Sequence, residues 1–170
     1  MKSGELVAVL EVILLLLIAL GLLCMAGRAQ EHPMQPNSKL TPGALDSHIT
    51  QDNIQQTICL SGYTKTVRNV PISVKKEVVR EYGLPESDLS KVEIDHYISL
   101  EIGGSNSIEN LWPQFYSAAP GQKGYLGARQ KDVVETELKR QVCSGQMRLE
   151  DAQVAIRAWP TYYKRYEEGK

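Results

Sequence analysis

An aspartate and a histidine stand side by side at Asp95 and His96, near the end of an apolar stretch that begins at Val92. A carboxylate can hold a divalent cation, which stabilises the charge that builds up on a phosphate, and a neutral imidazole can take a proton from water. These residue types therefore suit metal-assisted hydrolysis of a phosphate ester. An isolated Asp-His pair is more often a hydrogen-bonded surface pair than a catalytic one. The choice between these two interpretations therefore depends on the surrounding sequence.

The surrounding sequence predicts a strand, a loop, a second strand and a helix. Apolar residues alternate along the start of Val92–Gln114, and Gly103–Asn106 (GGSN) is a turn sequence. A second extended piece begins at Asn110. The segment Ala128–Val142 is amphipathic at helical spacing and predicts a helix. This order would bring the Asp-His pair, Asn110 and the polar start of the helix together.

The rest of the chain predicts short helical elements around this centre. A short helix is expected from Thr50, a strand over Tyr63–Val70, a helix over Pro71–Tyr82 and a packed helix at the aromatic C-terminal end. Residues 30–42 are polar and proline-rich without periodicity, which indicates a linker or extended arm. Residues 43–170 then form one domain.

The N-terminal segment, residues 1–29, has the layout of a secretory signal peptide. A polar start precedes an apolar run from Leu6 to Leu23 that only Glu11 interrupts, and small residues follow up to Ala29. Cleavage before Gln30 is expected, with cleavage after Ala26 as a second possible position. The main alternative is an uncleaved membrane anchor, and a lipid anchor at Cys24 is a weaker one. All of these place the domain outside the cytoplasm, either periplasmic or secreted, or anchored to the inner membrane and facing outward. A membrane contact is expected only if the segment is uncleaved.

Composition narrows the class of protein. Apolar residues make up 42% and charged residues 23%, which is typical of a folded domain. Lys plus Arg is 19 against 20 for Asp plus Glu, which excludes proteins that coat nucleic acid through excess positive charge. Three His and three Cys leave almost no material for a four-ligand zinc site. After signal cleavage Cys59 and Cys143 remain as a pair, and in an exported domain they predict a disulfide, with two free thiols as the alternative.

The run DHYISLEIGGSNSIENLW (residues 95–112) resembles the HNH endonucleases of the His-Me finger superfamily. Their pattern is roughly Asp-His, a few residues, Gly-Gly-Ser, then Asn-Leu. The wider chain is similar to small exported bacterial HNH-like proteins through TPGAL (41–45), TICLSGYT (57–64), EIDH (93–96), NLWPQ (110–114), GARQKD (127–132) and VCSGQ (142–146). This resemblance spans about residues 41–159.

The resemblance implies roles for three residues. His96 matches the general base, and Asp95 matches the metal-binding acid that precedes it. Asn110 matches the central asparagine, whose amide fixes the loop behind the histidine. The implied cofactor is Mg²⁺ or Mn²⁺, because an oxygen-rich site with one imidazole suits a hard cation.

The third HNH residue, a His or Asn on the helix, has no match, because neither type occurs after Leu111. Asp132, in the first turn of the predicted helix, is the expected second metal ligand. Arg129 and Lys131 are weak candidates for phosphate contacts at the same helix start.

The sequence thus predicts an α+β domain with a small ββα-metal core, braced by helices and one disulfide. The expected function is metal-dependent endonucleolytic hydrolysis of DNA or RNA without sequence specificity, with nucleic acid as substrate and no stable protein partner. The alternative is a catalytically inactive HNH-fold protein with a binding or structural role in the cell envelope. Oxygens of Asp95 and Asp132 and a nitrogen of His96 converging on one open point would favour the enzyme. A Lys or Arg side chain filling that point would favour the alternative.

Overall fold

A computed structural model of the chain describes Ile13 and residues 31–170. The predicted signal peptide at 1–29 lies outside the described residues, apart from Ile13. Within the described part, the fold is α+β, with one two-stranded antiparallel sheet, five α-helices and one disulfide. No helix in this part has the length and hydrophobicity that a membrane crossing requires.

The sheet consists of β1 (Val92–His96) and β2 (Leu111–Phe115). The strands pair so that Asp95 lies opposite Trp112 and His96 opposite Leu111. Side chains alternate between the two faces of a strand, so Val92 and Ile94 share one face while Glu93 and Asp95 share the other. The two expected extended pieces are therefore present, and the Asp-His pair closes the first of them.

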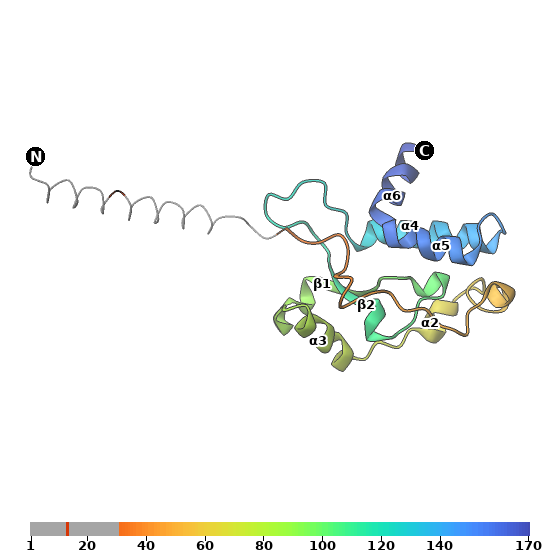
Figure 1. Ribbon diagram of the computed structural model, residues 1–170, viewed down its shortest axis with the longest axis horizontal. Coiled ribbons are helices and arrows are strands. Elements are labelled where there is room, and N and C mark those ends of the chain that lie inside the picture. Colours follow the sequence, from red (N-terminus) through yellow and green to blue (C-terminus); the bar gives the residue numbers. More distant parts are fainter. Residues whose placement is uncertain (1–12, 14–30) are drawn as a thin grey trace, which may run out of the picture.

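Helix α3 (Ile72–Glu81) covers the apolar face of the sheet (Figure 1). Its buried Val78 and Val79 pack against strand residues in a cluster of six fully or nearly buried apolar side chains: Val78, Val79, Val92, Ile94, Leu111 and Phe115. The predicted helix over Pro71–Tyr82 is confirmed, with Pro71 as the residue before its first turn.

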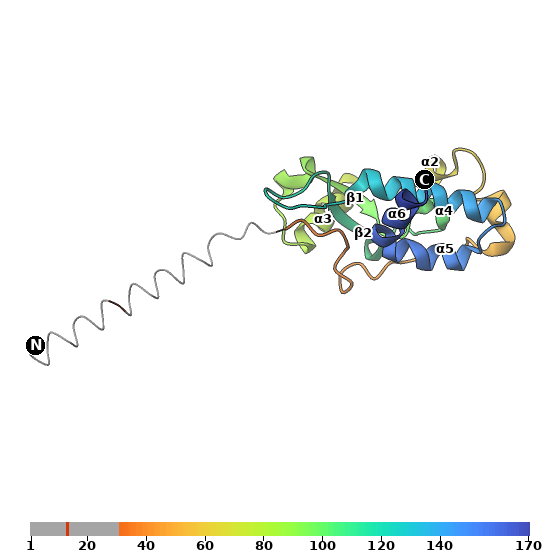
Figure 2. The ribbon, with the colours of Figure 1, turned by 90° about the horizontal axis from the view of Figure 1, so that it is seen from above.

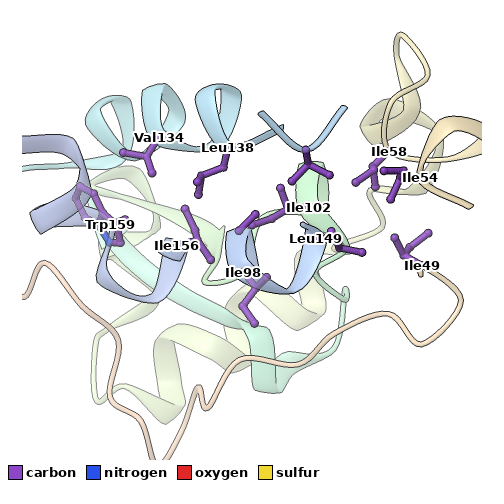
Figure 3. Close-up of a cluster of buried hydrophobic side chains, with 12 residues drawn as sticks. Ile49, Ile54, Ile58, Ile98, Ile102, Val134, Leu138, Leu149, Ile156 and Trp159 are labelled. Carbon is purple, nitrogen blue, oxygen red and sulfur yellow. The ribbon is translucent and has the colours of Figure 1, made fainter. Parts of the chain in front are cut away.

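The main core lies on the other side of the sheet. It is enclosed by α4 (Ala128–Cys143), α5 (Leu149–Ala155) and α6 (Trp159–Glu168), which lie together above the strands (Figures 1 and 2). Figure 3 shows Val134 and Leu138 of α4 directed towards Ile156 and Trp159. Short 3₁₀ helices complete the fold: η1 (Gln51–Gln56), η2 (Glu86–Ser90), η3 (Leu100–Ile102), η4 (Ile108–Asn110) and η5 (Ile156–Ala158).

The strand predicted over Tyr63–Val70 is wrong, because Tyr63–Val67 forms a helix, α2. Gly62 has a φ of 79°, a left-handed conformation that turns the chain into this helix. The alternation in the segment is only a few residues long, and among the described residues the segment pairs with neither β1 nor β2. The short helix expected from Thr50 is present as η1.

The predicted disulfide is confirmed between Cys59 and Cys143, with 5.5 Å between their Cα atoms. It joins the segment after η1 to the last residue of α4, at the edge of the main core. The bond closes a loop of 84 positions, so it links the first part of the domain to the last third. Such a loop contributes about 4 kcal/mol in the chain-entropy account.

Residues 31–42 form an irregular arm that lies against the domain. The ring of His32 stacks on Phe115 with 3.6 Å between centroids, and its backbone nitrogen donates to Gln122 Oε1 at 3.0 Å. Gln35 donates to the carbonyl of Arg157 at 3.1 Å. The arm contains neither helix nor strand but includes a turn at residues 38–40, and it is held against the domain by these contacts.

Candidate functional site

The candidate site is built at the end of β1, where the chain leaves the sheet and loops back to β2. Asp95 and His96 are the last two strand residues, and both are buried. The returning loop, residues 97–110, contains η3, η4 and the Gly-Gly-Ser-Asn turn. The conformation of this loop determines from which side solvent or a ligand can reach Asp95 and His96.

Asn110 fixes this loop through its side-chain amide, as the sequence predicts. Its Oδ1 accepts from the backbone nitrogen of Ile98 at 2.9 Å, and its Nδ2 donates to the carbonyls of Ile98 at 2.9 Å and Ser105 at 2.8 Å. Gly104 lies so close that a Cβ there would meet the carbonyl oxygen of Ile98 at 1.8 Å. A side chain at that position has no room, which explains the second glycine of the turn.

His96 is held by Asn106, the last residue of the same turn. Its Nε2 lies 3.1 Å from Asn106 Oδ1. The backbone fixes the orientation of the Asn106 amide, because Oδ1 also accepts from the nitrogen of Asn69 at 3.1 Å and Nδ2 donates to the carbonyl of Val67 at 2.8 Å. An oxygen therefore faces the ring, so Nε2 carries the proton and donates.

The other ring nitrogen, Nδ1, is buried and has no hydrogen-bond partner among the described residues. Burial lowers the pKa of His96 to about 4, although the bond to Asn106 and the charge of Asp95 oppose this shift. The imidazole is therefore neutral at pH 7. Its one free lone pair points into the protein, and only 1% of the residue is exposed.

Asp95 is paired with a lysine from α4. The Nζ of Lys131 lies 2.8 Å from Asp95 Oδ2 and donates to the carbonyl of His96 at 2.7 Å. It also forms an ion pair with Glu135, one turn further along the helix. Lys131 is completely buried, and Glu135 is 9% exposed. The ammonium thus sits among three oxygens, one of which belongs to Asp95, the predicted metal ligand.

A second contact closes the same cluster. The hydroxyl of Ser99 donates to Glu135 Oε2 at 2.7 Å and accepts from the backbone nitrogen of Glu101 at 3.1 Å. Burial raises the pKa of Glu135, and the charge of Lys131 opposes that shift. Burial alone would lower the pKa of Lys131, but Asp95 and Glu135 outweigh it and hold the ammonium protonated.

The remaining predicted site residues lie outside this cluster. Asp132 is exposed and lines a hollow with Thr136 and Tyr166 on the flank of α4. Arg129 is exposed at the start of α4, in the position expected for a phosphate contact. Lys131, the other candidate for such a contact, is enclosed instead. Among the described residues no group of three His, Cys, Asp or Glu side chains is arranged to hold a metal ion.

A groove of about 400 Å³ runs beside the outer edge of β1, and we call it the α3 groove. Arg68, Ile72, Lys75, Glu93 and Tyr116 line it together with strand residues. Within residues 31–170 the Arg68 and Lys75 side chains have no ion-pair partner, and Tyr116 is 58% exposed. Burial, with the charges of Asp95 and Asp132, raises the pKa of Glu93.

A second hollow of about 500 Å³ lies under the arm, away from Asp95. Its walls come from His32 and Pro36 of the arm, from Tyr82 after α3, and from Pro113 and Phe115 of β2. No site residue predicted from the sequence lines it.

Three residues of the cluster carry roles that the sequence reasoning missed: Asn106, Glu135 and Ser99. Asn106 belongs to the recognised GGSN turn, but nothing in the sequence links its amide to His96. Glu135 stands four residues after Lys131, a spacing that brings two helix side chains together. Val134 and Leu138 continue the same buried stripe, so helical spacing alone could have placed Lys131 on the inner face.

No protein-family model, no curated protein and no solved structure matches this chain.

Proposed function

We propose that this chain is an exported HNH-like protein that binds nucleic acid without metal-dependent hydrolysis. Its strand–loop–strand–helix order would be a ββα core in which a lysine takes the place of the metal. The single observation behind this proposal is the position of the Lys131 ammonium, 2.8 Å from Asp95 and fully enclosed. It occupies Oδ2 of the predicted ligand Asp95 with a positive charge.

The residues present do not fit a divalent metal. Asp95 is neutralised by Lys131, and Asp132 is exposed on the flank of α4 rather than in the cluster. For a metal ion to take this position, Lys131 would have to give up its contacts with Asp95, Glu135 and the carbonyl of His96. Its ammonium has no contact with solvent that could replace them. Removing the partner of a buried charge typically costs about 3–5 kcal/mol.

His96 is also poorly arranged to act as a general base that activates water for the hydrolysis of a nucleic acid. A general base needs an unprotonated nitrogen within hydrogen-bond reach of the water that it activates. Nε2 donates to Asn106, and Nδ1 is buried. The imidazole supports the loop around Asn106 in this arrangement.

The binding part of the proposal rests on the α3 groove. Arg68 and Lys75 offer two cations to a phosphate backbone, and the exposed ring of Tyr116 offers a face on which a base can stack. Arg129 at the start of α4 lies beside Tyr116 in an adjoining hollow and extends the cationic surface. The net charge of the chain is −1, so an overall positive charge does not contribute and binding depends on this local surface.

The test combines binding and cleavage on the same protein. Labelled single-stranded DNA and RNA are titrated in EDTA and followed by fluorescence anisotropy. Binding should weaken with salt, and Arg68→Ala and Lys75→Ala should weaken it further, whereas Lys164→Ala on the exposed face of α6 should leave it unchanged. No cleavage is expected in Mg²⁺ or Mn²⁺. Absence of binding, or equal effects of all three variants, would contradict the proposal.

Metal-dependent endonuclease activity is the second candidate, because His96 is neutral at pH 7, as a general base requires, and Asn110 holds the loop as the HNH resemblance implies. Chelator-sensitive cleavage that His96→Ala removes, by protein from a nuclease-deficient host, would establish this candidate and exclude the first. General-base catalysis is worth about 10²–10⁴-fold, so the loss would be clear.

A further inference from the structure

We propose that Lys131 is the resident cation of a centre formed by Asp95, Glu135 and the carbonyl of His96, and that removing its ammonium turns this centre into a divalent-cation site. The inference extends the metal-free reading of the proposed function. It does not depend on nucleic-acid binding, so its test contains no nucleic acid.

The first step is the chemistry of the cage. Three oxygens surround the ammonium: Asp95 Oδ2 at 2.8 Å, the carbonyl of His96 at 2.7 Å and Glu135 Oε1. Two carboxylates and a backbone carbonyl are the oxygen ligands that Ca²⁺, Mg²⁺ and Mn²⁺ prefer in proteins. The side chain of Lys131 fills the position that such an ion would take.

The second step is the need for a cation at this position. Asp95 is 7% exposed and Glu135 is 9% exposed, so two carboxyl groups lie close together with little water. Each disfavours ionisation of the other when no positive charge lies between them. Without the ammonium, the pair can protonate or bind a cation from solution.

The third step is the size of the cage. Nitrogen–oxygen distances of 2.7 and 2.8 Å to the carbonyl and to Asp95 exceed the lengths of about 2.3–2.6 Å typical of Ca²⁺ and far exceed the roughly 2.1 Å of Mg²⁺. A small inward movement of Asp95 and of the His96 carbonyl fits Ca²⁺, whereas Mg²⁺ demands a tighter octahedron. We therefore expect the emptied centre to favour Ca²⁺ over Mg²⁺.

Two variants separate the effect of removing the positive charge from the effect of making room for an ion. Lys131→Ala removes the ammonium and leaves room for an ion with its water, whereas Lys131→Met removes the charge but fills much of the same volume. Lys131→Ala should bind one Ca²⁺ per chain in isothermal titration calorimetry, with a dissociation constant of about 10⁻⁴–10⁻³ M, as in extracellular calcium modules. Wild type and Lys131→Met should show no such binding.

The second measurement is thermal stability. It can detect Ca²⁺ binding even if Lys131→Ala folds poorly without the ion. The melting temperature of Lys131→Ala should rise on addition of CaCl₂ relative to EDTA, and adding Asp95→Asn should remove both the rise and the binding. If Lys131→Ala is unfolded in EDTA, Ca²⁺ should restore its circular dichroism. No saturable binding up to about 10 mM Ca²⁺, roughly ten times the weakest expected constant, would overturn the inference. So would a variant that stays unfolded with the ion.

Discussion

Replacing Asn110 by Ala should destabilise the protein strongly, because its buried amide holds the loop through three hydrogen bonds. Those contacts are the donor from Ile98 and the carbonyls of Ile98 and Ser105, all at 2.8–2.9 Å, around a side chain with no exposed surface. A buried backbone group left without its partner costs about 1–3 kcal/mol. With partial relaxation of the loop, we expect a loss of about 3–5 kcal/mol in the free energy of unfolding.

The assay is urea-induced unfolding followed by circular dichroism, with the disulfide intact in every variant. Asn69→Ala is the matched control, because Asn69 is exposed and only its backbone nitrogen is bonded. That control should stay within about 0.5 kcal/mol of wild type. Asn110→Asp should also be destabilised, because a carboxylate cannot donate to the two carbonyls. A loss below about 1 kcal/mol for Asn110→Ala would refute the claim that this amide organises the loop.

Three further predictions address the bracing, the turn and the buried imidazole. Thiol titration of denatured, unreduced protein should find neither Cys59 nor Cys143 free, and reduction should cost about 4 kcal/mol of stability; two reactive thiols would contradict this. Gly104→Ala should prevent stable folding because its Cβ has no space, whereas Gly169→Ala, with its nearest contact at 3.5 Å, should melt like wild type. The third prediction concerns pH. The pKa of His96 is about 4 in the folded protein and about 6.5 when unfolded, so the unfolded state binds more protons between these values. The contribution of this residue should therefore be complete above pH 6.5 and fall by about 3 kcal/mol as the pH drops to 4. His96→Gln should show a flatter curve of unfolding free energy against pH, and parallel curves would show that the imidazole does not titrate in this way.

The helices around the site could be predicted where their apolar spacing was long. The segment Ala128–Val142 forms α4 within one residue, and Pro71–Tyr82 forms α3. The segment at Tyr63–Val67 was misinterpreted because a short alternation fits one turn of helix as well as a strand. In the folded protein α2 contacts η3, which is distant in the sequence. Local pattern does not contain that information.

In the candidate site too, contacts between residues close in the sequence could be predicted, whereas contacts between distant residues could not. The proximity of the Asp-His pair and Asn110 follows from a strand, a turn and a second strand, all close in the sequence. The position of Lys131 depends on how α4 docks on β1, some 35 residues away. A charged residue at a helix start is usually solvated, so the sequence favoured a phosphate contact for Lys131. The available signal for burial was that Lys131 lies on the same helix face as the buried Val134 and Leu138, with Glu135 four residues further on.

The central claim is that Lys131, rather than a metal, neutralises Asp95. Its most direct test is a crystal structure of the wild-type protein soaked in MnCl₂, with anomalous differences measured for manganese. We predict that electron density for the Lys131 ammonium will lie beside Asp95 and Glu135, with no anomalous peak at that position. An anomalous peak bound by Asp95, with the lysine displaced, would contradict the account and return the site to metal-dependent chemistry.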